Sequence, residues 1–313
     1  MTPESTSVFL TALLPVLTTF VIGFTAGHLK HFSVVNATAI NRMVAYYTLP
    51  LGLFSGMMAT PKSVLLGMGP QATLLALALV MSCALPFLFM RYVMARDLAE
   101  STLLALVIGT PSVLFIGLPV LGPLVGPPST LLVVITGLVQ NFVLIPLSLF
   151  VLSVATNQMA PNKTWYVQAL GVAKQPMVLA PFLAMLLVLC NVQLPDYVIQ
   201  SCKLLGNATG GLALFSAGLV LQTQRMTVRL KTVLPVLLHN VAIPGTAFVL
   251  LQRHGLSDEV VRQIVLTLAI PIGSITLIIA MQFKRLEREV ASSVAMSTAL
   301  SLLTMGGFLA LSS

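Results

Sequence analysis

Long hydrophobic runs alternate with short polar segments along the whole chain. A helix of about 20 apolar residues is long enough to cross the hydrocarbon core of a bilayer. The runs are continuous, whereas the strands of a membrane β-barrel alternate apolar and polar residues, so the pattern favours helices. We predict ten membrane-spanning helices, at residues 7–27, 37–59, 70–93, 101–125, 129–154, 176–192, 197–221, 232–252, 259–283 and 290–311.

Two of these runs contain helix-breaking residues near their middle. The fourth run is interrupted at Gly109, Pro111, Gly117 and Pro119, and the ninth at Pro271 and Gly273. Proline lacks a backbone N–H and clashes with the carbonyl four residues earlier, so both helices should be broken at these points. Paired interruptions at matching places in two halves are typical of the binding sites of secondary transporters.

The two halves of the chain also resemble each other. Leu51-Gly-Leu-Phe-Ser aligns with Leu212-Ala-Leu-Phe-Ser at an offset of 161 residues, while Pro111 and Pro271 are 160 apart and Pro86 and Pro244 are 158 apart. Repeat one is predicted at 1–155 and repeat two at 173–313, joined by a linker at 156–172. Each repeat holds five spans, an odd number, so the second should be inverted. The predicted fold is an all-α polytopic membrane protein of ten transmembrane helices, whose two inverted five-helix repeats each contribute one broken crossover helix.

Composition and charge agree with a membrane protein. The chain is 57% hydrophobic and 8% charged, with a mean hydropathy of +1.01, and a soluble domain cannot bury so much apolar surface. The net charge of +8 is spread between hydrophobic runs without forming a basic patch, so we expect no nucleic-acid partner. With the N-terminus outside, 12 of the 16 Lys and Arg residues fall on the inner side, which predicts that both termini face out. Isolated cysteines and the lack of a metal-ligand motif predict no metal and no cofactor.

Small and hydroxyl residues gather at the two breaks. After each break a second half-helix begins, and its unpaired N–H groups and positive dipole end attract anions. Hydroxyls there can donate hydrogen bonds to a carboxylate, and glycines let the backbone approach closely. Close helix packing is the alternative explanation for the same residues. The candidates are Gly109, Thr110, Pro111, Ser112, Pro119, Pro271, Gly273, Ser274 and Thr276.

Four further polar residues lie in mid-span: Gln140 and Asn141 in the fifth span, and His239 and Asn240 in the eighth. They either hold helices together or line the transport pathway. All eight acidic residues fall in loops or at span ends, which argues against a buried carboxylate relay and against an intramembrane enzyme. Coupling to a sodium ion would therefore use backbone carbonyls and hydroxyls. Coupling to a proton would use His239, an interfacial group or the substrate itself.

Several motifs resemble those of a known family. The segments beginning Asn41-Arg and Leu49-Pro50, followed by Phe115-Ile-Gly117-Leu-Pro119 and Ala269-Ile-Pro271, are similar to the auxin efflux carrier (PIN-like) family. Within it, the segment Ala173-Lys-Gln-Pro176 resembles the bacterial malonate and malate carriers. The short loop at 156–175 also argues for this compact bacterial type. The chain departs from the family pattern at Ser112, where the first crossover commonly carries an asparagine.

The resemblance implies a homodimeric elevator carrier in the bacterial inner (plasma) membrane. Spans 1, 2, 6 and 7 would form the scaffold, and spans 3–5 and 8–10 the moving transport domain. Pro111, Ser112, Pro119 and Pro271 would take the crossover positions. The implied substrate is a small organic anion, with malonate or a related dicarboxylate preferred. A sodium- or proton-coupled carrier of a monocarboxylate, bile-acid-like or auxin-like anion is the alternative, and a channel or receptor on the same fold ranks below it.

Overall fold

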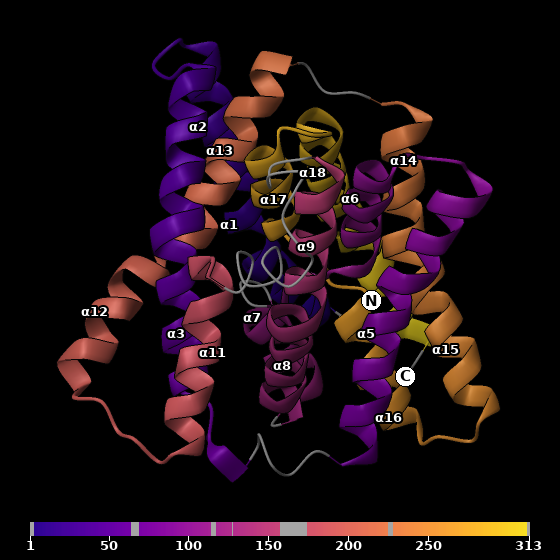
Figure 1. Cartoon of the computed structure of the whole chain (residues 1–313). Coiled ribbons are helices and arrows are strands. Elements are labelled where there is room, and N and C mark those ends of the chain that lie inside the picture. Colours follow the sequence, from indigo (N-terminus) through magenta and orange to yellow (C-terminus); the bar gives the residue numbers. More distant parts are fainter. Residues whose placement is uncertain are drawn as a thin grey trace.

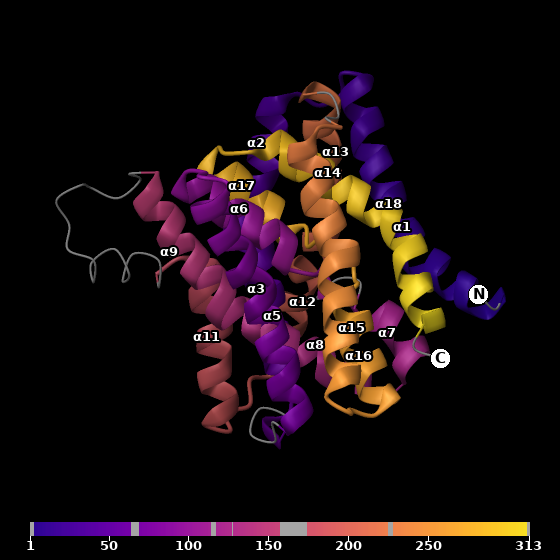
Figure 2. The same ribbon diagram turned by 90° about the vertical axis from the view of Figure 1, so that its right-hand side faces the viewer.

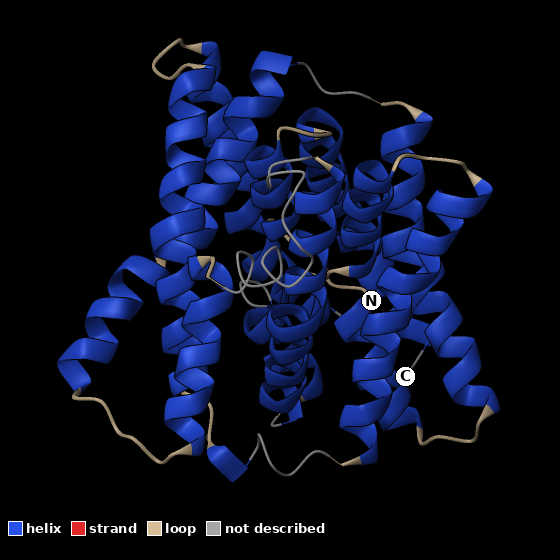
Figure 3. Cartoon of the chain, in the orientation of Figure 1, coloured by secondary structure: helices blue, strands red, loops and turns tan. Residues whose placement is uncertain are grey.

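The computed structural model describes residues 3–63, 69–113, 117–126, 128–156, 174–224 and 228–311. Helices make up this part of the chain, which contains no regular strand (Figures 1, 2 and 3). Phe115 of the family motif and most of the predicted linker lie outside the described residues. The first half of the chain contains α1 (Pro3–His28), α2 (Val34–Met43), η1 (Val44–Thr48), α3 (Leu49–Met58), α5 (Pro70–Leu88), η2 (Phe89–Val93), α6 (Leu98–Gly109), α7 (Leu118–Val125), α8 (Pro128–Val139), η4 (Gln140–Leu144) and α9 (Ile145–Ala155).

The second half of the chain is also helical. It contains α11 (Pro176–Leu189), α12 (Asp196–Gly206), α13 (Ala208–Gln224), α14 (Leu230–Leu237), η5 (Leu238–Ala242), α15 (Ile243–Arg253), α16 (Asp258–Leu268), α17 (Ile275–Phe283) and α18 (Glu287–Leu311). Helical segments therefore lie in each of the ten predicted intervals.

Length and hydropathy alone single out fewer membrane spans than ten. Among the described residues, four continuous helices qualify: Pro70–Val93, Leu131–Ala155, Asp196–Gln222 and Leu230–Arg253. A fifth qualifies if Glu287–Ser301 and Leu303–Leu311, bent by 45°, form one span. Leu98–Gly109 and Pro176–Leu189 are apolar but shorter. The fold is thus all-helical with several membrane-spanning candidates, while ten crossings and an inverted repeat remain predictions.

Three helices widen by one residue just before a proline. The N–H of Ile145 donates to the carbonyl of Gln140, five residues back, and Pro146 follows. The same π-helical turn precedes Pro244 and Pro50. Because proline has no N–H to give the carbonyl four residues earlier, a wider turn accommodates the loss. Two of these turns, η4 and η5, carry the polar pairs predicted in spans five and eight.

Most of the helix packing falls into two groups, and α18 contacts both, since it packs on α1 and α13 as well as on α14. In the first, α1 lies along α13, α3 lies along α11 and α12, and α2 packs on α13 (Figures 1 and 2). In the second, α5 packs on α6 and α8, α6 on α9, α15 on α16, and α14 on α18. Backbone contact between α1 and α13 requires glycine, since a Cβ at Gly23 would lie 2.1 Å from the carbonyl oxygen of Phe215 and one at Gly218 would lie 2.2 Å from that of Phe20.

Candidate functional site

The two predicted helix breaks are present, and they pair with each other. α6 ends at Gly109 and α16 at Leu268, and the chain continues in extended form through Pro111 and Ile272, which form an antiparallel bridge. The N–H of Ser112 donates to the carbonyl of Pro271 at 2.8 Å, and the N–H of Gly273 donates to that of Thr110 at 2.8 Å. The second half-helices, α7 and α17, begin at Leu118 and Ile275. We call the two paired segments, residues 109–112 and 270–274, the crossover.

Glycine is required at position 109 of the crossover and relieves a tight contact at position 273. A Cβ at Gly109 would lie 2.2 Å from the Sγ of Cys83 and 2.7 Å from its backbone nitrogen, so the end of α6 rests directly on α5. A Cβ at Gly273 would lie 3.1 Å from the carbonyl oxygen of Thr110, across the bridge. The packing explanation therefore accounts for both glycines without reference to a ligand.

Side chains from the surrounding helices satisfy the carbonyls of the first arm. Gln140 donates from Nε2 to the carbonyl of Pro111 at 2.8 Å. The Ser82 hydroxyl lies 2.7 Å from the carbonyl oxygen of Leu79 and 3.1 Å from that of Gly109, and it can donate to either. His239 is 1% exposed and touches both arms: Nδ1 lies 2.7 Å from the carbonyl oxygen of Ile108 and Nε2 lies 2.8 Å from that of Ile270. A neutral imidazole has one N–H, whereas a protonated ring donates from both nitrogens. The position between two helix C-termini also suits a cation.

Asn240 acts on the second arm through Ser297. Asn240 donates from Nδ2 to the carbonyl of Ser297 at 3.0 Å, and the Ser297 hydroxyl donates back to Oδ1 of Asn240 at 2.6 Å. The same hydroxyl oxygen accepts from the N–H of Ile272 at 3.0 Å. These contacts position the backbone of the arm, which is the helix-holding interpretation of Asn240.

Sequence reasoning missed two residues of this network, Ser82 and Ser297. The repeat held the signal that would have found them. Ser82 lies 158 residues before Asn240, and Ser297 lies 157 residues after Gln140. These offsets are close to those between the paired prolines. If the predicted repeat is correct, each missed serine is the counterpart of a residue that was predicted.

The hydroxyl groups at the crossover divide into two kinds. Thr110 donates to the carbonyl of Leu106 at 2.6 Å, and Thr276 donates to that of Gly273 at 2.7 Å, so both are used within their own helical turns. The side chains of Ser112 and Ser274 are buried, and within the described part of the chain their hydroxyls have no hydrogen-bond partner. These two serines remain able to bind a ligand.

Asn141 is the third group without a partner. Its side chain is 5% exposed, and its Oδ1 is buried with no hydrogen bond to any described residue. Its neighbour Gln140 reaches the first arm of the crossover, which puts η4 against the site. Leaving a buried amide oxygen unpaired costs about 1–3 kcal/mol, so a ligand that donates a hydrogen bond there would recover that energy.

The start of α17 supplies backbone donors. Thr276 and Leu277 form tight-turn bonds to Gly273 and Ser274, whereas the N–H groups of Ser274 and Ile275 have no acceptor among the described residues. They point from the positive end of a nine-residue helix. For the other arm, Pro119 lies in the first turn of α7, where the missing N–H of proline costs no helical bond, and residues 114–116 lie outside the described part.

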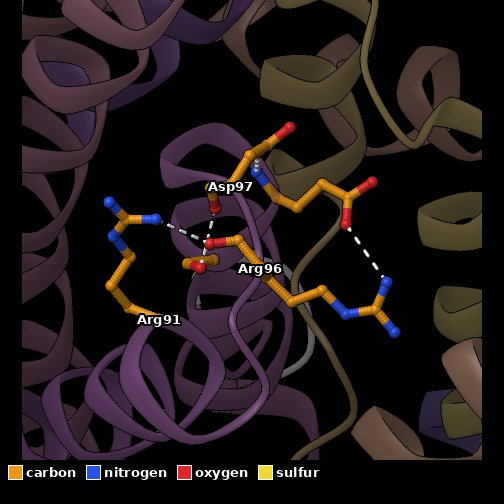
Figure 4. A network of polar contacts seen from close by, with 5 residues as sticks. Arg91, Arg96 and Asp97 are labelled. Atoms are coloured by element: carbon orange, nitrogen blue, oxygen red, sulfur yellow. Dashed lines mark hydrogen bonds and ion pairs between the residues drawn. The ribbon is translucent and has the colours of Figure 1, made fainter.

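A polar network fixes the start of α6, at the opposite end from the crossover (Figure 4). Asp97 accepts at Oδ1 from the N–H of Glu100 at 2.6 Å and so caps the helix. Nη1 of Arg96 lies 3.5 Å from Oε2 of Glu100 in an ion pair, and Nη1 of Arg91 donates to the carbonyl of Arg96 at 2.9 Å. These acidic residues hold the helix end in place, as expected of carboxylates outside the span centre.

Comparison with known proteins gives the family. Residues 8–309 match the family model described as "Membrane transport protein". The chain belongs to this family of membrane transport proteins. It is 28% identical over 292 residues to the uncharacterized transporter YfdV of Escherichia coli (strain K12), covering 92% of this chain and 93% of YfdV. The same identity and coverage are found with YfdV of Escherichia coli O157:H7 and of Shigella flexneri.

Family membership confirms the resemblance drawn from the crossover motifs, since this is the auxin efflux carrier (PIN-like) family. It identifies the protein as a membrane transporter rather than an enzyme. The paired breaks at Pro111 and Pro271 are the candidate binding site for the transported ligand, because broken helices expose backbone groups inside the protein.

Proposed function

We propose that this protein is a secondary transporter of a small organic anion, most simply malonate or a related short dicarboxylate, in the bacterial inner membrane. The observation that carries the proposal is the crossover, where Ser112 and Ser274 are buried with unpartnered hydroxyls beside the N-terminus of α17. Two hydroxyl donors and two free backbone N–H groups can bind a carboxylate without a cationic side chain. Asn141 can accept a hydrogen bond from a second, protonated carboxyl group.

The proposed architecture is the predicted one: ten spans in two inverted repeats, both termini outside, and a homodimer working by an elevator motion. The observed packing supports the division into scaffold and transport domain. The pairs α1–α13, α3–α11 and α3–α12 lie within the proposed scaffold, and α5–α6, α6–α9 and α15–α16 lie within the proposed transport domain. The contacts of α18 with α1 and α13 lie at the proposed boundary between the two.

The hydrogen bonds around the crossover support movement of the transport domain as one body. Its two arms bond to each other, and they also bond to Ser82 of α5, Gln140 of η4, His239 of η5 and Ser297 of α18. All four of these elements belong to the proposed transport domain. The site would therefore travel intact past the scaffold, exposing the anion first to one side of the membrane and then to the other.

The same contacts favour a proton over a sodium ion for coupling. The carbonyls of Ile108, Gly109, Thr110 and Pro111 each accept a hydrogen bond or contact His239. A sodium ion would therefore depend on the hydroxyls of Ser112 and Ser274 and on Oδ1 of Asn141, the same groups that the anion uses in this proposal. His239 instead meets an acceptor at each nitrogen, which is the arrangement that a protonated ring satisfies fully. We therefore assign His239 as the coupling residue, with Asn240 positioning the second arm.

The proposal is tested by counterflow in proteoliposomes. Purified protein with malonate trapped inside should take up labelled malonate with saturation, and short dicarboxylates should compete better than acetate, cholate or indole-3-acetate. A hydrogen bond to a charged group contributes about 1.5–3 kcal/mol, so Ser112→Ala and Ser274→Ala should each lower kcat/KM about tenfold or more. Ser201→Ala is the matched control, because that hydroxyl is exposed and bonds only to the carbonyl of Tyr197.

Three results would contradict the proposal. Unaltered uptake in both crossover variants would remove the site. Flux that does not saturate would indicate a channel. Preference for cholate, indole-3-acetate or acetate over every dicarboxylate would show that the protein is a transporter of a different class of anion.

A further inference from the structure

A polar cavity lies away from the crossover, between α2 with η1 on one side and α17 on the other. The helices α2 and α17 are labelled in the upper part of Figure 1. Its volume is about 150 Å³. Asn41, Arg42 and Tyr46 line one wall, and Met281, Gln282 and Lys284 line the other. The cavity thus joins the first helix group to the second.

Asn41 presents an unsatisfied acceptor in this cavity. It is 5% exposed, and Nδ2 donates to the carbonyl of Ala37 at 3.0 Å and to Oγ of Ser216 at 2.7 Å. Turning the amide over would bring its oxygen against the Ala37 carbonyl, so these bonds fix its orientation. Oδ1 is buried and has no partner among the described residues.

Gln282 presents a second unsatisfied acceptor. Its Nε2 donates to Oε1 of Gln175 at 3.3 Å, and its own Oε1 is buried without a hydrogen bond from any described group. Two buried amide oxygens left open on facing walls of one cavity are unusual, because buried polar atoms are nearly always paired. Together they call for a ligand that donates hydrogen bonds.

The charges of the cavity call for an anion. Arg42 and Lys284 both line it, and no acidic side chain does. Glu287 interacts electrostatically with Lys284 but is not part of the wall. The positive charges of Arg42 and Lys284 attract a carboxylate. The planar guanidinium of Arg42 can bind both carboxylate oxygens.

We infer that this cavity is a binding site for a short carboxylate that also carries a hydroxyl group. The carboxylate contacts Arg42 and Lys284, and the O–H donates to Oδ1 of Asn41 or Oε1 of Gln282. Its size selects a small ligand, because pockets for drug-sized molecules measure about 300–1,000 Å³. A ligand here touches α2 and α17 at once, so its binding favours the arrangement in which these two helices face each other.

The test is calorimetric binding of malate and succinate, which differ by one hydroxyl, to the purified full-length protein. It is run in a Ser112→Ala, Ser274→Ala background, so that the crossover does not contribute. Malate should bind at least tenfold more tightly than succinate. Arg42→Gln should weaken both ligands at least tenfold, and Gln282→Leu should reduce the preference for malate. Lys231→Gln is the control, since Lys231 is an exposed cation that does not line the cavity.

Either of two results would overturn the inference. One is equal binding of malate and succinate. The other is an equal loss in Arg42→Gln and Lys231→Gln, which would mean diffuse attraction to a basic surface. Neither result bears on the crossover, because uptake through that site is measured separately with Ser112→Ala and Ser274→Ala in proteoliposomes.

Discussion

Gly109→Ala is the sharpest structural test of the crossover, because it adds one carbon where two helices meet. The new Cβ would lie 2.2 Å from the Sγ of Cys83, 2.7 Å from the nitrogen of Cys83 and 2.7 Å from the carbonyl carbon of Ser82. Real Cβ atoms essentially never come within 3.0 Å of such neighbours. Two of the three neighbours are backbone atoms of α5, which rotation of a side chain cannot move away.

The expected cost follows from this geometry. Forcing an extra carbon into a packed interior costs about 1–3 kcal/mol, and backbone neighbours place Gly109→Ala at the upper end. Displacing α6 from α5 would also shift the Ser82 hydroxyl from the carbonyl of Gly109, now 3.1 Å away. We therefore expect the free energy of unfolding in detergent to fall by about 2–3 kcal/mol, with uptake reduced in the fraction that folds.

Two further variants make the assay specific. Gly122→Ala in α7 is the matched control, since a Cβ there meets nothing within 4 Å, and replacing a helical glycine gains up to about 1 kcal/mol. Cys83→Ala combined with Gly109→Ala removes only the sulfur contact, so it should restore part of the loss and leave the backbone share. If Gly109→Ala unfolds with the same free energy as the wild type, the close packing of α6 on α5 is wrong.

Three other predictions follow from the same contacts. Ser297→Ala leaves the buried N–H of Ile272 without an acceptor, so unfolding should become easier by about 1–3 kcal/mol, and unchanged stability in denaturation would contradict the Ser297 bond. Asp97→Ala should cost about 0.5–2 kcal/mol through loss of the helix cap, whereas Asp97→Asn should cost little because asparagine caps equally well, and neither should abolish malonate exchange. His239→Gln should remove the stimulation of uptake by a pH gradient while retaining counterflow; a response equal to that of the wild type would move coupling to another group.

The sequence predicted the breaks because they depend on local backbone chemistry. Pro111 and Pro271 cannot continue a helix, and the near-constant repeat offset placed the two breaks at matching positions. The sequence did not predict which hydroxyl groups already have a hydrogen-bond partner. Thr110 and Thr276 stand beside Ser112 and Ser274 in sequence, yet the threonines bond to their own helical turns and the serines do not.

The longer-range partners were hidden for a different reason. His239 bridges Ile108 and Ile270, and the Ser297 hydroxyl accepts from Ile272. These contacts depend on how three or four helices pack together, and no local sequence pattern predicts that packing. The π-helical turns were more accessible. Each of the three described before a proline lies directly ahead of an X-Pro step in an apolar run, which is a readable local signal.

The hydrogen bonding of the crossover separates shape from selectivity. Its backbone is held by the bridge and by hydrogen bonds with side chains of four helices, none of which requires the side chain of Ser112, Ser274 or Asn141. Substitution at these three positions can therefore change which substrate the site binds without disrupting the crossover backbone. Related transporters could therefore differ in substrate through single substitutions that leave the protein folded. Ser112→Asn would be one such substitution.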